Sequence, residues 1–314
     1  MRSAGSRGDC QGVKTLTRRS GPDVRTPYFG IDGGYGMRWV LTALVAVVVQ
    51  FVAACSGTGT GGETKGLGHI HGLGINPANG DLYAGTHYGV YRLASGREPE
   101  LVGDVVQDFM GFTVAGPDHF LGSGHPDQGD RQAPSNLGLI ESTDGGQSWN
   151  SVSLSGEADF HSLESRHNTI YGLDGLTSAL LVSGPNGTWE RRAEIRAADI
   201  AVSPRTPDEI LATTAAGLVR SIDQGRTFSP VAAEPSLTLL SWPDDGPLVG
   251  VDPSGKVYTS TDSGASWRAE HELASRPQAL LAAGDGLVFV ATAAGVHRSE
   301  DNGETFRTFV ESQP

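Results

Sequence analysis

Three short segments of the sequence place two potential ligand side chains on either side of one apolar residue. They are His69-Ile70-His71, Asp108-Phe109-Met110 and Asp159-Phe160-His161. Residues i and i+2 of a β-strand point to the same face of a sheet. Each segment, if it is extended, therefore presents its two outer side chains together and packs its central residue on the opposite face.

Two predicted loops carry further polar groups of the same kinds. His87 and Tyr88 lie in a short turn between two apolar runs. A much longer polar segment, residues 125–138, contains His125, Asp127, Asp130 and Arg131. A long loop in a compact repeat is often functional, so this segment is a second source of candidate site residues.

These residue types are compatible with three kinds of site. Imidazoles combined with carboxylates suit zinc or copper, and Met110 favours copper if it ligates; the candidate metal ligands are His69, His71, His125 and His161. Paired carboxylates could serve a glycosidase as acid and base; the candidates are Asp108, Asp127 and Asp159. A protein or glycan ligand would contact exposed loop groups; the candidates are His87, Tyr88 and Asp130. We favour binding, assisted by a metal or not, over catalysis, because it requires the least special geometry.

The elements that position these residues are defined by an internal repeat. Four segments share the pattern Ser-x-Asp-x-Gly-x-(Ser/Thr)-aromatic, namely 142–149, 221–228, 260–267 and 299–306, and a shortened copy without the Asp covers 183–189. One constant interval of 39 residues separates Asp223, Asp262 and Asp301, and Asp144 precedes Asp223 by 79 residues, about two such intervals. Self-similarity at a fixed period indicates a repeat architecture.

The residue types of the repeat have structural roles. The Asp carboxylate can accept backbone N–H bonds within its own turn. Glycine allows a backbone conformation that a Cβ would hinder, and the final aromatic side chain packs between neighbouring sheets. We therefore interpret Asp144, Asp223, Asp262 and Asp301 as structural residues.

Short apolar or alternating runs separated by Gly, Pro and Asp turns precede each copy of the repeat, which indicates strands. Four strands per unit, repeated radially, predict an all-β fold, the β-propeller. Six four-stranded blades are favoured and seven are the alternative. The expected blades cover residues 66–105, 106–153, 154–192, 193–232, 233–271 and 272–311.

The propeller would bring the candidate residues together. The innermost strand of each blade begins near one mouth of the central channel, and the loop between the second and third strands reaches the same face. The polar candidates come from the first three expected blades, whereas the same positions of the last three offer mainly Thr213, Thr214, Asp252 and Thr292. We therefore expect a one-sided cluster of histidines and carboxylates at one mouth.

The repeat is similar to the Asp-box, or BNR repeat, of sialidases, sortilin-type receptors and photosystem assembly factors. The whole of residues 66–309 resembles bacterial BNR-repeat lipoproteins with a glycosyl-hydrolase-like label, through segments 68–77, 85–92, 110–127, 137–149 and 156–163. This resemblance implies a propeller, but the repeat itself is not catalytic and fold does not imply function. A sialidase would need an Arg-(Ile/Leu)-Pro motif in its first blade. Only Arg92 and Arg97 occur there, so no sialidase catalytic set is found.

The N-terminal region has the pattern of a lipoprotein signal. Met37-Arg38 forms a short positive start, an apolar run follows, and Val52-Ala53-Ala54-Cys55 supplies small residues before a cysteine. The run is short for a membrane span, which needs about 20 residues; an uncleaved membrane anchor is the alternative. We expect a non-native or cytosolic extension over 1–36, a signal peptide over 37–54, lipidation at Cys55, a flexible tether over 55–65 and the propeller over 66–311.

Composition limits the compartment and the partners. The 314 residues include 44 glycines and carry a formal net charge of −13, and removal of the Arg-rich leader would make the charge more negative. An acidic surface argues against nucleic acid and against adhesion to anionic lipid. The only cysteines are Cys10 and Cys55, so the cleaved protein would have no disulfide. We expect a monomer on the outer face of the cell membrane that contacts the membrane through its lipid anchor only.

Overall fold

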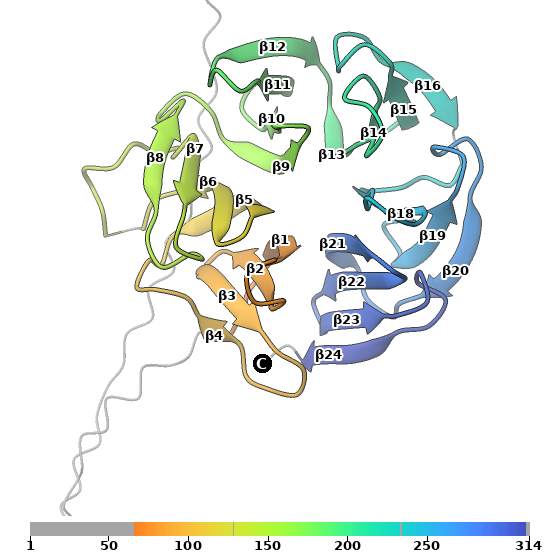
Figure 1. Cartoon of the computed structure of the whole chain (residues 1–314), viewed down its shortest axis with the longest axis horizontal. Helices are drawn as coiled ribbons and strands as arrows, with labels where there is room; N and C mark the ends of the chain where they lie inside the picture. Colours follow the sequence, from red (N-terminus) through yellow and green to blue (C-terminus); the bar gives the residue numbers. More distant parts are fainter. Residues whose placement is uncertain (1–65, 128, 233, 312–314) are drawn as a thin grey trace, which may run out of the picture. The chain divides into compact units, whose positions relative to one another are not determined.

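The computed structural model describes residues 66–127, 129–232 and 234–311. These residues form six four-stranded antiparallel sheets arranged as a ring around a central channel (Figure 1), and no helix occurs among them. The prediction of a six-bladed β-propeller is therefore confirmed. The expected extension, signal peptide, Cys55 and tether lie outside the described residues.

The first three blades carry the candidate site residues. Blade 1 consists of β1 (Ile70–Ile75), β2 (Leu82–Thr86), β3 (Gly89–Leu93) and β4 (Glu100–Leu101). Blade 2 consists of β5 (Asp108–Gly116), β6 (His119–His125), β7 (Leu139–Ser142) and β8 (Asn150–Ser153). Blade 3 consists of β9 (Phe160–Arg166), β10 (Thr169–Asp174), β11 (Ala179–Ser183) and β12 (Trp189–Glu194).

The last three blades complete the ring. Blade 4 consists of β13 (Ala197–Val202), β14 (Ile210–Thr214), β15 (Gly217–Ser221) and β16 (Ser229–Ala232). Blade 5 consists of β17 (Leu239–Ser241), β18 (Leu248–Val251), β19 (Lys256–Ser260) and β20 (Arg268–Glu272). Blade 6 consists of β21 (Pro277–Gly284), β22 (Leu287–Thr292), β23 (Gly295–Ser299) and β24 (Arg307–Glu311). Strands β12 and β20 extend slightly beyond the expected blade limits at 192 and 271.

Burial explains the strand sequences. The second strand of a blade packs on both faces against neighbouring sheets, so β2 and β18 are buried at every residue and are rich in Leu, Val, Ala and Gly. The outermost strands face water, and four of the six carry charged residues, as in the Trp189–Glu194 sequence WERRAE. Among the described residues, no helix is long and apolar enough to cross a membrane.

The four repeat segments form the same hydrogen-bonded turn. In the 260–267 copy, Ser260 Oγ donates to Asp262 Oδ1 (2.8 Å) and accepts the buried Gly264 N–H (2.8 Å). Asp262 also accepts the Ser266 N–H (2.8 Å) and hydroxyl (2.6 Å). Equivalent bonds surround Asp144, Asp223 and Asp301. Each turn sets an aromatic side chain against an apolar cluster between blades; these side chains are Trp149, Phe228, Trp267 and Phe306.

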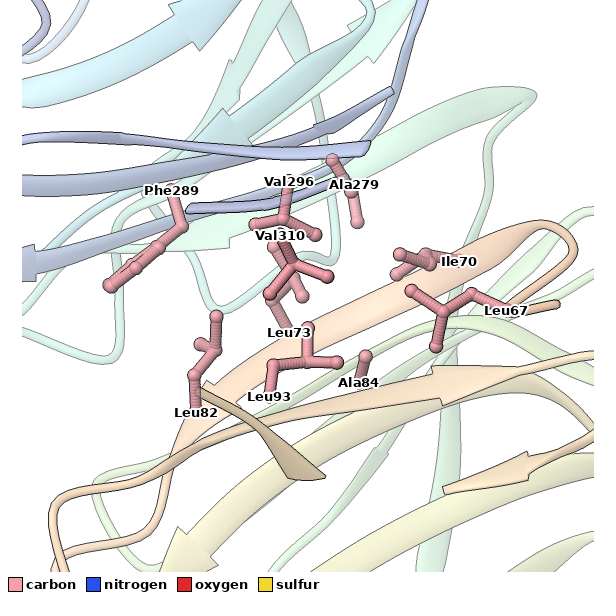
Figure 2. Close-up of a cluster of buried hydrophobic side chains, with 11 residues drawn as sticks. Leu67, Ile70, Leu73, Leu82, Ala84, Leu93, Ala279, Phe289, Val296 and Val310 are labelled. Carbon is pink, nitrogen blue, oxygen red and sulfur yellow. The ribbon is translucent and has the colours of Figure 1, made fainter. Parts of the chain in front are cut away.

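The ring closes by packing rather than by a shared strand. Each sheet is built from one uninterrupted stretch of chain, so blades 1 and 6 exchange no strand. Buried side chains of blade 1 and of the segment before it, such as Leu67 and Leu82, pack with Phe289 and Val310 of blade 6 (Figure 2). The Gly96 N–H donates to the Phe309 carbonyl across the same joint (3.3 Å). Apolar burial is thus the main interaction that closes the propeller.

Candidate functional site

A β-bulge lies near the start of the innermost strand in five of the six blades. Strand pairing shifts between residues 70 and 72, 109 and 111, 160 and 162, 197 and 199, and 277 and 279. A bulge leaves one residue unpaired and can re-aim its side chain. The bulged residues all line a channel cavity of about 430 Å³; they are His71, Met110, His161, Ala198 and Gln278.

The residues between the candidate ligands are anchors. Ile70, Phe109 and Phe160 are at most 2% exposed and belong to apolar clusters between blades. Their burial holds the backbone of the three ligand-bearing segments. The structure thus places these segments at equivalent positions of three blades.

Three histidines of blade 1 converge at the channel mouth. One ring nitrogen from each of His69, His71 and His87 can be chosen so that all three lie within 4.8 Å of one another. The Nε2 atoms of His71 and His87 are 3.5 Å apart, and the ring centroids of His69 and His71 are 4.4 Å apart. Among the described residues, this is the group of His, Cys, Asp or Glu side chains close enough to hold a metal ion together.

The backbone before β1 brings His69 to this position. The His87 N–H donates to the His69 carbonyl (3.3 Å), which ties the segment to the β2–β3 turn. Gly68 has φ +62°, and a Cβ there would lie 2.8 Å from the Tyr88 ring. Glycine is therefore required at residue 68 both by conformation and by the close approach of Tyr88.

Asp108 of blade 2 connects two of the histidines. Its Oδ1 lies 2.7 Å from His87 Nδ1, and its Oδ2 lies 3.2 Å from His125 Nδ1. A carboxylate only accepts hydrogen bonds, so each histidine donates from Nδ1. A neutral His87 consequently carries its lone pair on Nε2, which faces His71.

Asp159 and His161 of blade 3 extend this network. His161 Nε2 lies 2.9 Å from Asp159 Oδ2, and His125 Nε2 lies 3.5 Å from the same oxygen. The Asp159 side chain is 7% exposed, and the backbone N–H of Asp159 donates to Asp174 Oδ1 (3.0 Å). The network therefore runs from the blade 1 histidines through Asp108 and His125 to His161.

The local environment gives the histidines different basicities. Burial, followed by repulsion from His69 and His87, lowers the pKa of His71 to about 4. Burial and the neighbouring His87 also lower the pKa of His69. In contrast, the hydrogen bond that His161 donates to Asp159 raises the pKa of His161. Burial alone would raise the pKa of Asp159, but its bonds and charge interactions with His161 and His125 lower it. At neutral pH, His69 and His71 are therefore uncharged and able to ligate a cation.

An open groove adjoins the network on the same face. His161 lines both the channel and this groove, which has a volume of about 740 Å³ and extends over blades 3 to 5. Its lining includes Arg196, Asp174, Leu237 and several hydroxyl groups. The groove gives solutes access to the His161 end of the network.

Some candidate residues lie outside the network. Asp127 and Asp130 are exposed, and their carboxylates accept backbone N–H groups of their own loop, from Gly129 and from Gln132 and Ala133 respectively. The Tyr88 ring lies 6.4 Å from the His87 ring, between centroids. Of the segment 125–138, His125, the last residue of β6, therefore joins the network, whereas Asp127 and Asp130 shape the loop that follows.

Sequence reasoning missed residues that support the network. Asp174 fixes the backbone of Asp159, and a Cβ on Gly175 would lie 2.8 Å from His161 Nε2. The Asp174-Gly-Leu-Thr sequence is an Asx-turn signal that could have indicated this role. Glu164 and Asp199 were missed as well: they accept the Val202 and Leu240 N–H groups across blade boundaries (2.8 and 2.9 Å).

No protein-family model matches the sequence, and no curated protein matches it significantly. Solved structures share its fold. A GH74 enzyme from Niastella koreensis is similar with a TM-score of 0.57 and 16% identity, over 77% of this chain and 45% of its own. An ancestral GH74 enzyme has a TM-score of 0.51 and 14% identity, over 79% and 39%. A chain of a nidogen/laminin complex has a TM-score of 0.54 and 12% identity, over 69% and 88%. The chain thus spans less than half of these GH74 chains, and the similarities concern the propeller fold alone.

Proposed function

We propose that this protein is a metal-binding β-propeller that is tethered to the outer face of the cell membrane and holds a transition-metal ion at His69, His71 and His87. The observation that carries the proposal is the convergence of three imidazole nitrogens within 4.8 Å. Three imidazoles form a ligand set typical of zinc and copper.

The distances suit an ion after a small movement. Two nitrogens that bind one tetrahedral ion at about 2.0–2.1 Å lie about 3.3 Å apart. The His71 and His87 Nε2 atoms, at 3.5 Å, are already close to this spacing. His69 is exposed, so its ring can move the remaining distance without disturbing the core.

Asp108 supports the same assignment. A metal-ligating histidine usually donates its other N–H to a carboxylate, which fixes the tautomer and increases the basicity of the ligating nitrogen. The Nδ1 of His87 meets Asp108 in this way at 2.7 Å. The arrangement leaves Nε2 of His87 for the ion.

The proposed location depends on the N-terminal sequence. Small residues before Cys55 match a lipoprotein cleavage site, and a Gly- and Thr-rich segment of few residues joins Cys55 to the propeller. A lipid on Cys55 would hold the propeller close to the membrane, where it could bind metal ions outside the cell. The acidic net charge of −13 is compatible with a cationic ligand.

Glycoside hydrolysis is the alternative that the GH74 structures suggest. A general acid requires a carboxyl group with a raised pKa. At the mouth, Asp108 hydrogen-bonds to two histidines, and the pKa of Asp159 is lowered by His161 and His125 against the effect of burial. The carboxyls with raised pKa values, Glu164 and Asp199, accept backbone N–H groups between blades. The site therefore favours metal binding over this alternative.

Metal analysis of the full-length protein in detergent tests the proposal. The protein is stripped with a chelator, exposed to Zn²⁺ or Cu²⁺, desalted and analysed by mass spectrometry. We expect bound metal in the wild type and a clear loss in His71→Ala. The control is His119→Ala, which removes a histidine that contacts Glu141 away from the mouth. A wild type that retains no metal after saturating exposure would refute the proposal.

A further inference from the structure

The groove over blades 3 to 5 contains an arginine that neither the fold nor the proposed metal site uses. Arg196 lies in the short connection between β12 and β13 and lines this groove. The neighbouring Ile195 packs against an apolar cluster, and its N–H donates to the Ser178 carbonyl (2.7 Å). The backbone beside Arg196 is therefore tied to the β10–β11 turn, whereas Arg196 itself is exposed.

The charge of Arg196 is not balanced by a neighbour. Within residues 66–127, 129–232 and 234–311, its side chain forms no ion pair and no hydrogen bond. Glu194, two residues earlier, pairs with Arg191 (3.7 Å). Asp174, the carboxylate that lines the same groove, is 3% exposed and accepts N–H groups of its own turn at both oxygens. The guanidinium group is therefore available to a ligand.

Three hydroxyl groups of the groove are available as well. The side chains of Ser178, Ser236 and Thr238 line it and make no hydrogen bond to any other residue that the structure describes. In contrast, the Thr213 hydroxyl donates to the Thr238 carbonyl (3.0 Å) and is thus used by the fold. Hydroxyl and guanidinium groups both donate hydrogen bonds, and an anionic oxygen is their strongest kind of acceptor.

Apolar side chains form another part of the lining. Leu173, Ile195, Leu237 and Pro253 contribute to the groove, whose volume is about 740 Å³. Sites for small molecules commonly have volumes of about 300–1,000 Å³, an apolar lining and a few polar groups that orient the ligand. An inorganic anion would fill little of this space. The groove therefore fits an organic anion with an apolar body.

The equivalent positions of the other blades show how charge is divided around the mouth. Arg196 directly precedes the bulge of blade 4; the residues at this position are His69, Asp108 and Asp159 in blades 1 to 3 and Arg276 in blade 6. Blade 4 lies across the ring from blade 1 (Figure 1). The imidazoles and carboxylates thus belong to one half of the ring and the two arginines to the other, which favours an anion on the blade 4 side.

We propose that this groove binds a small organic carboxylate, which pairs with Arg196 while the hydroxyl groups and apolar walls hold the rest of the molecule. The guanidinium fork of arginine presents parallel N–H groups that match the two oxygens of a carboxylate. The proposal does not require a metal ion at the three histidines. It therefore adds a second class of ligand on the same face of the propeller.

The test uses para-fluorobenzoate as the probe and fluorine NMR to measure its binding to the full-length protein in detergent. The protein is first stripped of metal with a chelator, which is then removed. We expect saturable binding of the benzoate and none of para-fluorobenzamide, which has the same shape without the charge. Arg196→Ala should weaken benzoate binding about tenfold or more, because charge-assisted hydrogen bonds are lost. Arg196→Lys should restore part of the affinity.

Arg205→Ala is the matched control. Arg205 lies beyond the other end of β13 and is exposed, and its side chain has no ion pair in the described part of the chain. Its replacement changes the net charge of the protein by the same amount as Arg196→Ala. The control should bind the benzoate as the wild type does, and circular dichroism verifies the fold of each variant.

The outcomes separate the groove from the proposed metal site. His71→Ala should bind the benzoate as the wild type does, and a protein that binds benzoate but no zinc would refute only the proposed function. Benzoate binding that requires Zn²⁺, is lost in His71→Ala and is kept in Arg196→Ala would place the anion on the metal and overturn the groove proposal. Equal binding of benzoate and benzamide, equal losses in Arg196→Ala and Arg205→Ala, or no binding by the wild type would overturn it as well.

Discussion

His87 of blade 1 and Asp108 of blade 2 meet at 2.7 Å between Nδ1 and Oδ1, across the boundary between two sheets. The contact joins the β2–β3 turn to the first residue of β5. The tautomer of His87, a proposed metal ligand in blade 1, therefore depends on the carboxylate of Asp108 in blade 2.

Asp108→Asn should therefore weaken zinc binding without unfolding the protein. Loss of a carboxylate that orients ligating histidines typically reduces metal affinity about 10–100-fold. Competition with a chromogenic chelator measures the affinity. Asp127→Asn, in the exposed loop, is the matched control and should bind as the wild type does. Equal affinities in the two variants would contradict the positioning role of Asp108.

Ser260→Ala should destabilise the propeller without affecting metal binding. The hydroxyl of Ser260 is the acceptor for the buried Gly264 N–H, which would lose its partner. An unsatisfied buried donor costs about 1–3 kcal/mol, and urea denaturation measures the free energy of unfolding. Ser151→Ala, at an exposed position of β8, should change it by less than about 0.5 kcal/mol. A metal-binding defect in folded Ser260→Ala would mean that the repeat turn has a functional role.

Asp199→Asn should change how stability depends on pH. Burial raises the pKa of Asp199 to about 6, above the value of about 3.9 expected in the unfolded chain. The folded state therefore binds more protons between these values, and the stabilisation from protonated Asp199 is lost as pH rises through 6.

The difference in the free energy of unfolding between the wild type and Asp199→Asn should thus favour the wild type most near pH 4 and least above pH 7. Denaturation of both proteins at a series of pH values gives this difference directly. Titrating groups that do not interact with Asp199 are common to both proteins, so their contributions cancel; Glu164 is the exception, because the charge of Asp199 is one cause of its raised pKa. A difference that does not vary with pH would show that the carboxyl of Asp199 ionises normally in the folded protein.

Cys55→Ser should abolish lipid attachment and release the protein from the membrane fraction. Cys55 follows the small residues of the expected cleavage site. Incorporation of labelled palmitate and cell fractionation measure the outcome. Cys10→Ser removes the other cysteine and should leave labelling unchanged. Labelling that depends on Cys10 instead would contradict the proposed anchor.

The blades could be predicted because their information is local and repeated. The constant interval between Asp223, Asp262 and Asp301 sets the period, and each copy is fixed by bonds within one turn. Blade 1 lacks the repeat segment but could still be assigned from its strand pattern. The C-terminal segment 305–310 was expected to help close the ring, but how Phe289 and Val310 pack on blade 1 could not be predicted, because it depends on contacts between distant segments.

The site could be predicted only in part. Equivalent positions in consecutive blades indicated that His71 and His161 would face one channel, which both line. The bulges that direct them depend on pairing between strands, which the sequence does not specify. Side-chain orientation decides which histidines contact Asp108 and which converge on one another. The sequence interpretation therefore placed His69 and His71 among the metal ligands but His87 among the residues that contact another ligand.

The joint between blades 1 and 6 shows that the ring does not depend on which blade comes first along the chain. Because no strand crosses this joint, it is the same kind of interface as the other five, formed mainly by side chains that pack between two complete sheets. A circular permutant that links residue 311 to residue 67 and begins in another connection between blades should therefore form the same ring. In genetic terms, each blade is a single uninterrupted gene segment, so a whole blade can be exchanged by one replacement.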